Sequence, residues 1–230
     1  MDLVTIAVIP AALLGAMVLF RCLRFVTTPL LRRMGIYRYY SPMFLTVPFG
    51  VRTLELHLGT AWDFFRRRNL NQLELLMHLG RGLLALLEAV DRGEVRADTR
   101  LRGTMCFLST ETMQKIGFQT RPMNVLEGAL FLLNYPEICL LQSLVKGRVC
   151  LVNLNQVRMF KASVHDLLRT RDRLVTVVDL LERRCNSLSR KRILAIKPGS
   201  ELPTRSRRLT STTGDNNEFT YDVWRSVDSP

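Results

Sequence analysis

The chain has 230 residues, a formal net charge of +13 and 47% hydrophobic residues. This length suits one domain with short attachments, and the apolar fraction is sufficient for a core. A large multidomain machine and a wholly disordered chain are therefore excluded. The mean hydropathy of +0.09 is too low for a polytopic membrane protein but high for a soluble one, so we expect one locally apolar element.

The N-terminal segment Leu3–Phe20 (LVTIAVIPAALLGAMVLF) carries no charge. Its length is about the minimum for crossing a ~30 Å hydrocarbon core as a helix that rises 1.5 Å per residue. A cleaved signal peptide would begin with positive charge, whereas here Asp2 precedes the run and the arginines follow it. The sequence therefore predicts an uncleaved single-pass anchor with the bulk of the chain cytoplasmic. A buried core helix is the alternative.

Basic and aromatic residues follow the apolar run. Arginines next to a membrane helix and tyrosines at the headgroup layer are typical of a membrane interface, and an ordinary loop is the equal alternative for the tyrosines. The residues predicted to face the membrane are Arg21, Arg24, Arg32, Arg33, Tyr37, Tyr39 and Tyr40.

The remaining charge is spread along the chain without a single basic block. So basic a protein is expected to have a polyanionic neighbour, which is either nucleic acid or an anionic membrane surface. The even spread argues against a DNA-binding arm. We therefore expect membrane lipids, anionic ones in particular, as partners, with a membrane protein as a further partner.

The sequence after the anchor predicts an α+β fold, a compact domain of mixed helices and strands. Residues 43–47 and 51–58 predict a hairpin around Pro48-Phe49-Gly50, because β-forming residues flank turn residues. The alternation in 53–58 predicts one buried and one polar face. Thr60 with Asp63, and Asn71 with Glu74, have capping-box spacing and predict helices over 60–68 and 71–90.

The second half of the domain is predicted from weaker signals. We expect a strand over 103–108, a helical turn over 110–116, two short buried helices within 125–145, a strand over 149–152, and a helix capped by Ser163. From about Asn186 the composition becomes polar and predicts a flexible basic tail, in which Tyr221–Trp224 folds back or docks. The predicted organisation is an anchor and juxtamembrane segment over 1–35, an α+β domain over 36–186 and a disordered tail over 187–230.

Sequence motifs for common chemistry are missing. The three histidines and five cysteines lack the spacing of metal ligands, so we expect no metal and no cofactor. Gly80-Arg81-Gly82 lies inside a predicted helix and lacks the strand–loop–helix context of a phosphate loop. The odd number of separated cysteines favours a reducing compartment over a disulfide framework.

One polar cluster, formed by Glu55, His57, Thr60 and Asp63, stands in an apolar setting. Glu55 and His57 are two apart on a strand and share a face, and a histidine with carboxylates can do acid–base chemistry near neutral pH. The candidate catalytic residues are therefore His57, Asp63 and Glu55, with Arg66, Arg67 and Arg68 available to hold an anionic group. The alternative is that Glu55 and His57 form a solvent-exposed strand face while Thr60 and Asp63 cap a helix.

Lys115-Ile116-Gly117-Phe118 is similar to the short helix-then-GF signature found late in GNAT acetyltransferases. The acetyl-CoA loop of that family, with its Arg/Gln-x-x-Gly-x-Gly/Ala pattern, has no match in this sequence. The resemblance covers four residues, and no family is assigned from it.

Three functions follow from the sequence. The leading one is a non-enzymatic, membrane-anchored interaction or accessory protein that serves an envelope or lipid-related process. The second is a membrane-associated enzyme that acts on a lipid or other amphiphilic anionic substrate. The third is nucleic-acid binding, which predicts one continuous basic surface and steep salt dependence.

Overall fold

The computed structural model describes residues 3–67, 70–106 and 108–196, and it has a mixed α+β fold with a six-stranded sheet. The strands are β1 (Arg38–Ser41), β2 (Phe44–Pro48), β3 (Thr53–Leu58), β4 (Arg100–Met105), β5 (Gln119–Arg121) and β6 (Arg158–Ser163). The helices are α1 (Leu3–Arg33), α2 (Ala61–Arg66), α3 (Gln72–Asp91), α4 (Thr110–Lys115), α5 (Val125–Lys146), α6 (Val164–Arg169) and α7 (Arg171–Ile196), with a 3-10 turn over Leu154–Gln156.

The sheet has the order β1-β2-β3-β4-β6-β5. Strands β1, β2 and β3 form an antiparallel meander, which confirms the predicted hairpin. Strand β4 is parallel to β3, since α2 and α3 return the chain to the same end of the sheet, and β6 then inserts antiparallel between β4 and β5. The β3–β4 pairing covers only Thr53 to Glu55 and Arg100 to Arg102, so beyond that point the two central strands are no longer paired with each other.

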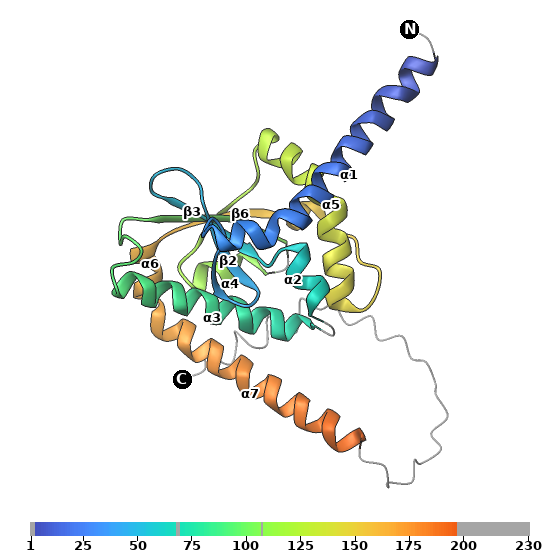
Figure 1. Cartoon of the computed structure of the whole chain (residues 1–230). Coiled ribbons are helices and arrows are strands. Elements are labelled where there is room, and N and C mark those ends of the chain that lie inside the picture. The colour runs from blue at the N-terminus through green and yellow to red at the C-terminus, as the bar shows by residue number, and fades with distance from the viewer. Residues whose placement is uncertain (1–2, 68–69, 107, 197–230) are drawn as a thin grey trace.

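Helix α3 is the centre of the main core. Its start has the predicted capping box, in which Asn71 accepts from the Glu74 amide at 2.9 Å and the Glu74 carboxylate accepts in return. Leu83, Leu86 and Leu87 are almost fully buried in the cluster beneath the sheet. Helix α7 packs on the opposite side of α3, and Figure 1 shows these two helices on one side of the sheet.

Helices α1 and α5 lie away from α7, next to α2 (Figure 1). The first turns of α1 project away from the domain, while its second half reaches the domain beside α2 and α5 (Figure 1). There the ring of Phe25 lies 5.0 Å from that of Trp62 and 6.1 Å from that of Phe65. Helix α5 contains Pro136 and bends between its two halves.

Several predicted elements are wrong or shifted. Residues 125–145 form one helix instead of two short ones, because Pro136 bends α5 without ending it. Residues 149–152 form no strand, and the strand predicted at 103–108 begins earlier, at Arg100. The helix capped by Ser163 is interrupted at Thr170 and continues as α7 past the predicted boundary at 186. Tyr221–Trp224 lies outside the described residues.

Candidate functional site

The polar face of β3 meets a matching face of β4. In the parallel pairing Glu55 lies opposite Arg102, and alternation along each strand places His57 and Thr104 on that same side of the sheet. Leu56 and Leu101 point to the other side, into the main core. The sequence predicted this alternation in β3, but it gave no indication that a helix would cover the polar face.

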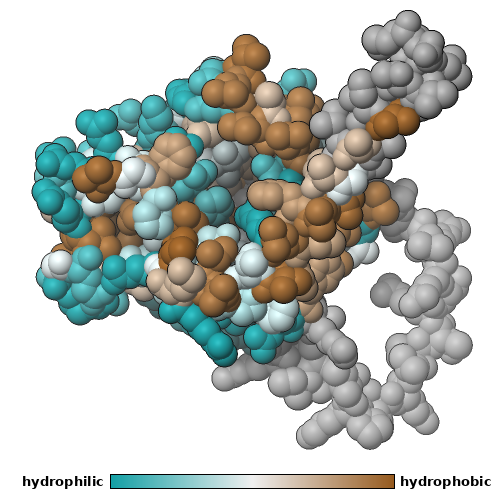
Figure 2. Space-filling model, turned by 45° about the horizontal axis from the view of Figure 1, so that its top comes forward, coloured by the Kyte–Doolittle hydropathy of each residue, from teal (hydrophilic) through white to brown (hydrophobic). Residues whose placement is uncertain are grey.

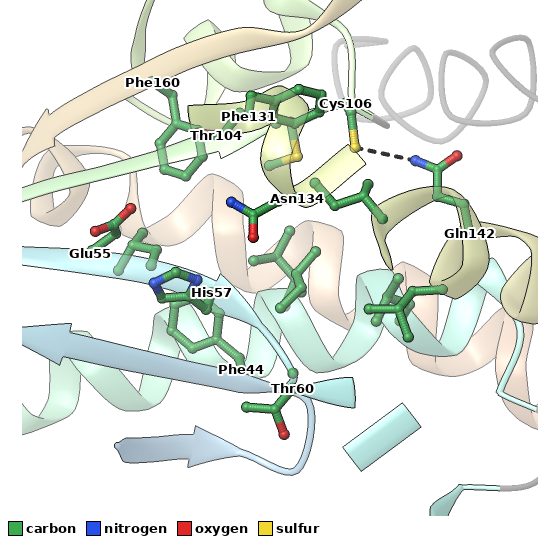
Figure 3. Close-up of a pocket in the computed structure, with 18 of the residues that line it drawn as sticks. Phe44, Glu55, His57, Thr60, Thr104, Cys106, Phe131, Asn134, Gln142 and Phe160 are labelled. Carbon is green, nitrogen blue, oxygen red and sulfur yellow. Dashed lines mark hydrogen bonds between the residues drawn. The ribbon is translucent and has the colours of Figure 1, made fainter. Parts of the chain in front are cut away.

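Helix α5 covers this face and encloses a cavity of about 350 Å³, called the α5 cavity below. Its walls come from both faces of the sheet, because the cavity continues between β3 and β4 where their pairing ends. Figure 3 shows Glu55 and His57 directed into it from β3, opposite Asn134 of α5. Most of the wall is apolar, and its principal apolar members are Leu56, Met105, Phe131, Ile138, Leu141, Met159 and Phe160.

The carboxylates of the α5 cavity have cationic partners among the described residues. Glu55 lies 3.9 Å from Arg102, whose guanidinium also stacks 3.6 Å from the ring centre of Phe49. The other two carboxylates in the wall form the pairs Glu127–Arg121 and Glu137–Arg21.

Arg24 also lines the cavity, and within the described part of the chain its guanidinium has no carboxylate partner. The wall therefore carries an excess of positive charge at the α1 end.

Two titratable groups of the cavity are held in their neutral forms. Burial lowers the pKa of His57, and the charges of Arg24 and Arg102 lower it further against the opposing effect of Glu55. Burial raises the pKa of Cys106 to about 11, so this thiol stays protonated, and its sulfur accepts from Gln142 Nε2 at 3.2 Å (Figure 3). The cavity thus offers a neutral imidazole and no thiolate.

Asp63 does not join His57. Its Oδ2 accepts hydrogen bonds from the Thr60 amide at 2.8 Å, the Thr60 hydroxyl at 2.8 Å and the Tyr39 hydroxyl at 2.6 Å. The carboxylate is buried and is not part of the cavity wall. Burial and the bond to Asp63 raise the pKa of Tyr39. Asp63 therefore caps α2 and joins it to β1 through Tyr39. For Asp63 the helix cap, which was the alternative to a catalytic role, describes the structure.

The other candidate residues divide between the cavity and the protein surface. Glu55 and His57 line the cavity and are not a solvent-exposed strand face. Arg66 stacks over the ring of Trp62, Arg67 Nη1 lies 3.1 Å from His78 Nε2, and Arg68 is outside the described residues.

The residues predicted to face the membrane mostly contact the protein. Arg32 stacks over the ring of Tyr39 at 4.4 Å, while Tyr40 packs against the main core. Tyr37 is half-buried and Arg33 is exposed. Tyr39 and Tyr40 belong to the domain because their strand β1 pairs with β2, which places their rings against neighbouring elements.

Arg21 joins α1 to the bend of α5. Pro136 has no N–H, so the helical bond to Leu132 is missing and the helix opens there. Arg21 Nη2 donates to the Leu133 carbonyl at 2.7 Å and to Asn134 Oδ1 at 2.6 Å, and Arg21 also pairs with Glu137. One guanidinium thus binds a backbone carbonyl next to the bend and two polar side chains of α5.

An apolar surface surrounds the cavity. Leu19 and Val26 of α1 and Leu126 of α5 are each 70% exposed, and Figure 2 shows brown side chains on both sides of a hollow. Further exposed members are Phe20, Leu23, Leu30, Leu130, Leu132, Leu133, Leu140, Val149 and Leu151. Exposed apolar residues gathered in this way are typical of interaction surfaces.

Among the helices of the described residues, α5 is the one that is long and apolar enough to cross a membrane by length and composition. It is not N-terminal, and of its residues only Phe131 and Cys139 are buried. The prediction of a span at Leu3–Phe20 is therefore not confirmed, although α1 runs through this segment as a helix.

Sequence reasoning missed Arg102, Thr104 and Asn134 as members of the cavity. The alternating pattern of 100–105 was the available signal for Arg102 and Thr104, whereas nothing local marks Asn134. The described residues contain no cluster of His, Cys, Asp and Glu suited to a metal ion.

Comparisons with protein-family models, with curated proteins and with solved structures give no significant match to this chain. The segment that is similar to the GNAT signature has the expected local form. Helix α4 ends at Lys115, Gly117 has a φ of +90°, and Phe118 is buried against Phe160 at a ring distance of 5.1 Å.

Proposed function

We propose that the protein is a membrane-bound accessory protein of a lipid-related process, anchored by α1 and with α5 against the bilayer surface. The observation that carries this proposal is the exposed apolar surface shared by α1 and α5. Leaving such side chains in water costs about 25 cal/mol per Å² of apolar area. A bilayer removes this cost without requiring a second protein.

The contact of Arg21 with α5 sets the depth of the domain under this proposal. Arg21 directly follows the uncharged run, and it holds α5 at the level where that run ends. Helix α5 would then lie in the headgroup region instead of crossing the membrane, which suits Glu127 and the capping residue Asn124 at its start. The arginines after the run favour a cytoplasmic position for the domain.

Membrane flotation and washing of the full chain tests the proposal. Wild-type protein should resist both alkaline carbonate and high salt. Replacing Ala11 and Ala12, at the middle of the uncharged run, by lysine should release the protein in carbonate, since two charges at the centre of the span are costly. The matched control, Arg32→Gln with Arg33→Gln, should stay bound. Release of the wild-type protein by salt alone would refute the anchor.

A second candidate, acyl transfer, is favoured by the sheet. The strand order with one central parallel pair is the order that the GNAT resemblance implies, and the GF segment follows β4 through α4. The start of α3 differs from the family pattern, because Asn71 and Glu74 cap it in place of a glycine-rich loop. Titration of the full chain with acetyl-CoA tests this candidate. Saturable binding would support it, and heats equal to dilution would refute it.

The nucleic-acid hypothesis gains no support from the fold. Many surface arginines are paired with carboxylates, as in Arg81–Glu182, Arg96–Asp98 and Arg171–Asp91. Such pairs reduce the positive potential that phosphates would meet.

A further inference from the structure

We propose that the α5 cavity binds the single hydrocarbon chain of an anionic amphiphile, with the charged head group between Arg24 and His57. The inference rests on the proposed membrane location only for the supply of the ligand. The cavity itself, its size and its charges come from the fold of the domain.

The volume of the cavity suits one chain. An apolar cavity of about 150 Å³ holds benzene, which has six carbon atoms. By proportion, the 350 Å³ of the α5 cavity accommodates about fourteen carbons, enough for a chain of twelve. Two chains of that length do not fit, so a diacyl lipid could place at most part of one chain inside.

The inner wall has the chemistry of a chain-binding site. Phe131, Ile138 and Leu141 of α5 line the cavity together with Met159 and Phe160 of β6, and Figure 3 shows Phe131 and Phe160 on the side away from Thr60. Small-molecule sites typically combine such apolar walls with a few polar groups that fix orientation. Arg24 of α1 and His57 of β3 lie on one side of the cavity, so a head group held between them would direct the chain toward β6. Gln142 and Lys146 are polar members of the wall on the second half of α5.

The charge at the α1 end selects the head group. Glu55 is neutralised by Arg102 at 3.9 Å, whereas Arg24 has no carboxylate partner within the described residues. The imidazole of His57 makes no hydrogen bond with them and can donate one to a bound oxygen anion. An anionic head group would form an ion pair with Arg24 and accept a hydrogen bond from His57, while a cationic one would be repelled by Arg24.

The position of Arg24 gives the ligand a route from a bilayer. It lies one helical turn after Phe20, the last residue of the uncharged run. With α1 inserted, Arg24 would stand at headgroup depth, where the charged end of a single-chain amphiphile already resides. The chain could then enter the cavity beside α5 while its head group stays at nearly the same depth.

Photolabelling of the full chain in phosphatidylcholine vesicles tests the proposal. The probe is dodecanoate carrying a diazirine near the chain end, and labelled positions are identified by peptide mass spectrometry. Labels should fall on α5 and β6 segments of the cavity. An excess of dodecanoate should suppress them and dodecyltrimethylammonium should not. Suppression by dodecyl phosphate as well would show that phosphate head groups are accepted, and its failure would restrict the site to carboxylates.

Matched variants locate the two ends of the ligand. Arg24→Gln and His57→Gln should each raise the half-saturating probe concentration about tenfold, as expected for loss of a hydrogen bond to a charged group. Arg33→Gln, an exposed arginine on the same helix, should leave it unchanged. Ile138→Phe shortens the cavity, so octanoate should become the better competitor over dodecanoate.

The outcomes separate this inference from the proposed function. Labels confined to the exposed faces of α1 and α5, or equal competition by the cationic amphiphile, would overturn the inference. An unchanged Arg24→Gln variant would do the same. Flotation of the same samples reports membrane binding independently, so a protein that floats but shows no competed labelling refutes the cavity ligand alone. A labelled protein that does not float refutes the anchor alone.

Discussion

Two glycines in α3 mark where neighbouring layers come closest to the helix. A Cβ atom added at Gly82 would lie 2.5 Å from the Cβ of Phe44 and 2.3 Å from Cδ1 of its ring. A Cβ added at Gly80 would lie 2.5 Å from Cγ2 of Val178 on α7. The two positions are about 200° apart around the helix, so they face the sheet and α7 respectively.

The expected free-energy changes differ because the opposing atoms differ. Alanine is favoured over glycine in a helix by about 1 kcal/mol, whereas overpacking a core costs about 1–3 kcal/mol or more. At Gly82 the clash is with a Cβ fixed to the backbone of β2, which no rotamer change relieves. Gly82→Ala should therefore destabilise the fold by about 2 kcal/mol. Gly80→Ala meets only the end of a valine side chain and should cost less than half as much.

Thermal or urea unfolding of the full chain in one lipid or detergent environment, followed by far-UV circular dichroism, measures these changes. Gly128→Ala in α5 is the control, since no atom lies within 4 Å of its added Cβ, and it should not destabilise. An unfolding midpoint for Gly82→Ala equal to or above that of the wild type would refute the reasoning. So would a Gly80→Ala variant less stable than Gly82→Ala.

Three further predictions concern polar contacts. Asp63→Asn weakens three hydrogen bonds to a buried carboxylate and should lower the free energy of unfolding by about 2–4 kcal/mol. Tyr39→Phe removes one of these bonds and should lower it by about 1–2 kcal/mol in the same unfolding assay. Arg21→Gln should speed hydrogen exchange around the bend of α5 and leave exchange in α3 unchanged. Equal exchange at the bend in the variant and the wild type would contradict the role of this contact. Hydrogen bonds from Arg121 and from the Asn124 amide hold the pKa of Glu127 at about 2, below its ordinary value of 4.5, so the stability it gives to the start of α5 is complete above pH 4.5 and should be lost as the pH falls toward 2. A Glu127→Gln variant should lack this pH dependence in exchange measurements.

Local signals in the sequence predicted local structure well. The capping boxes predicted at Thr60 and Asn71 and the helix cap predicted at Ser163 are present, because each depends on residues three apart. The hairpin was found for the same reason, since its turn and alternation lie within one short segment. These features could be predicted because the interactions that create them are close in sequence.

The cavity depends on contacts between distant segments, and most of it could not be predicted. His57 and Asp63 are near in sequence, but the turn at Gly59 sends their side chains to different partners. The polar residues of 125–145 argued for two buried helices, whereas Arg21 of α1 satisfies several of them and allows one bent helix. Alternation along β3 identified the polar face without identifying what covers it.

Helix α5 is an excursion between two adjacent antiparallel strands. Arg121 at the end of β5 is paired with Met159 near the start of β6, so the sheet needs only a short turn at this point. The entropic cost of closing a loop grows slowly with its length, and a longer or shorter excursion would therefore leave the sheet, α3 and α7 almost undisturbed. The fold thus separates the core around α3 from a covering segment whose length can change without altering that core, and the size of the α5 cavity can vary through that segment alone.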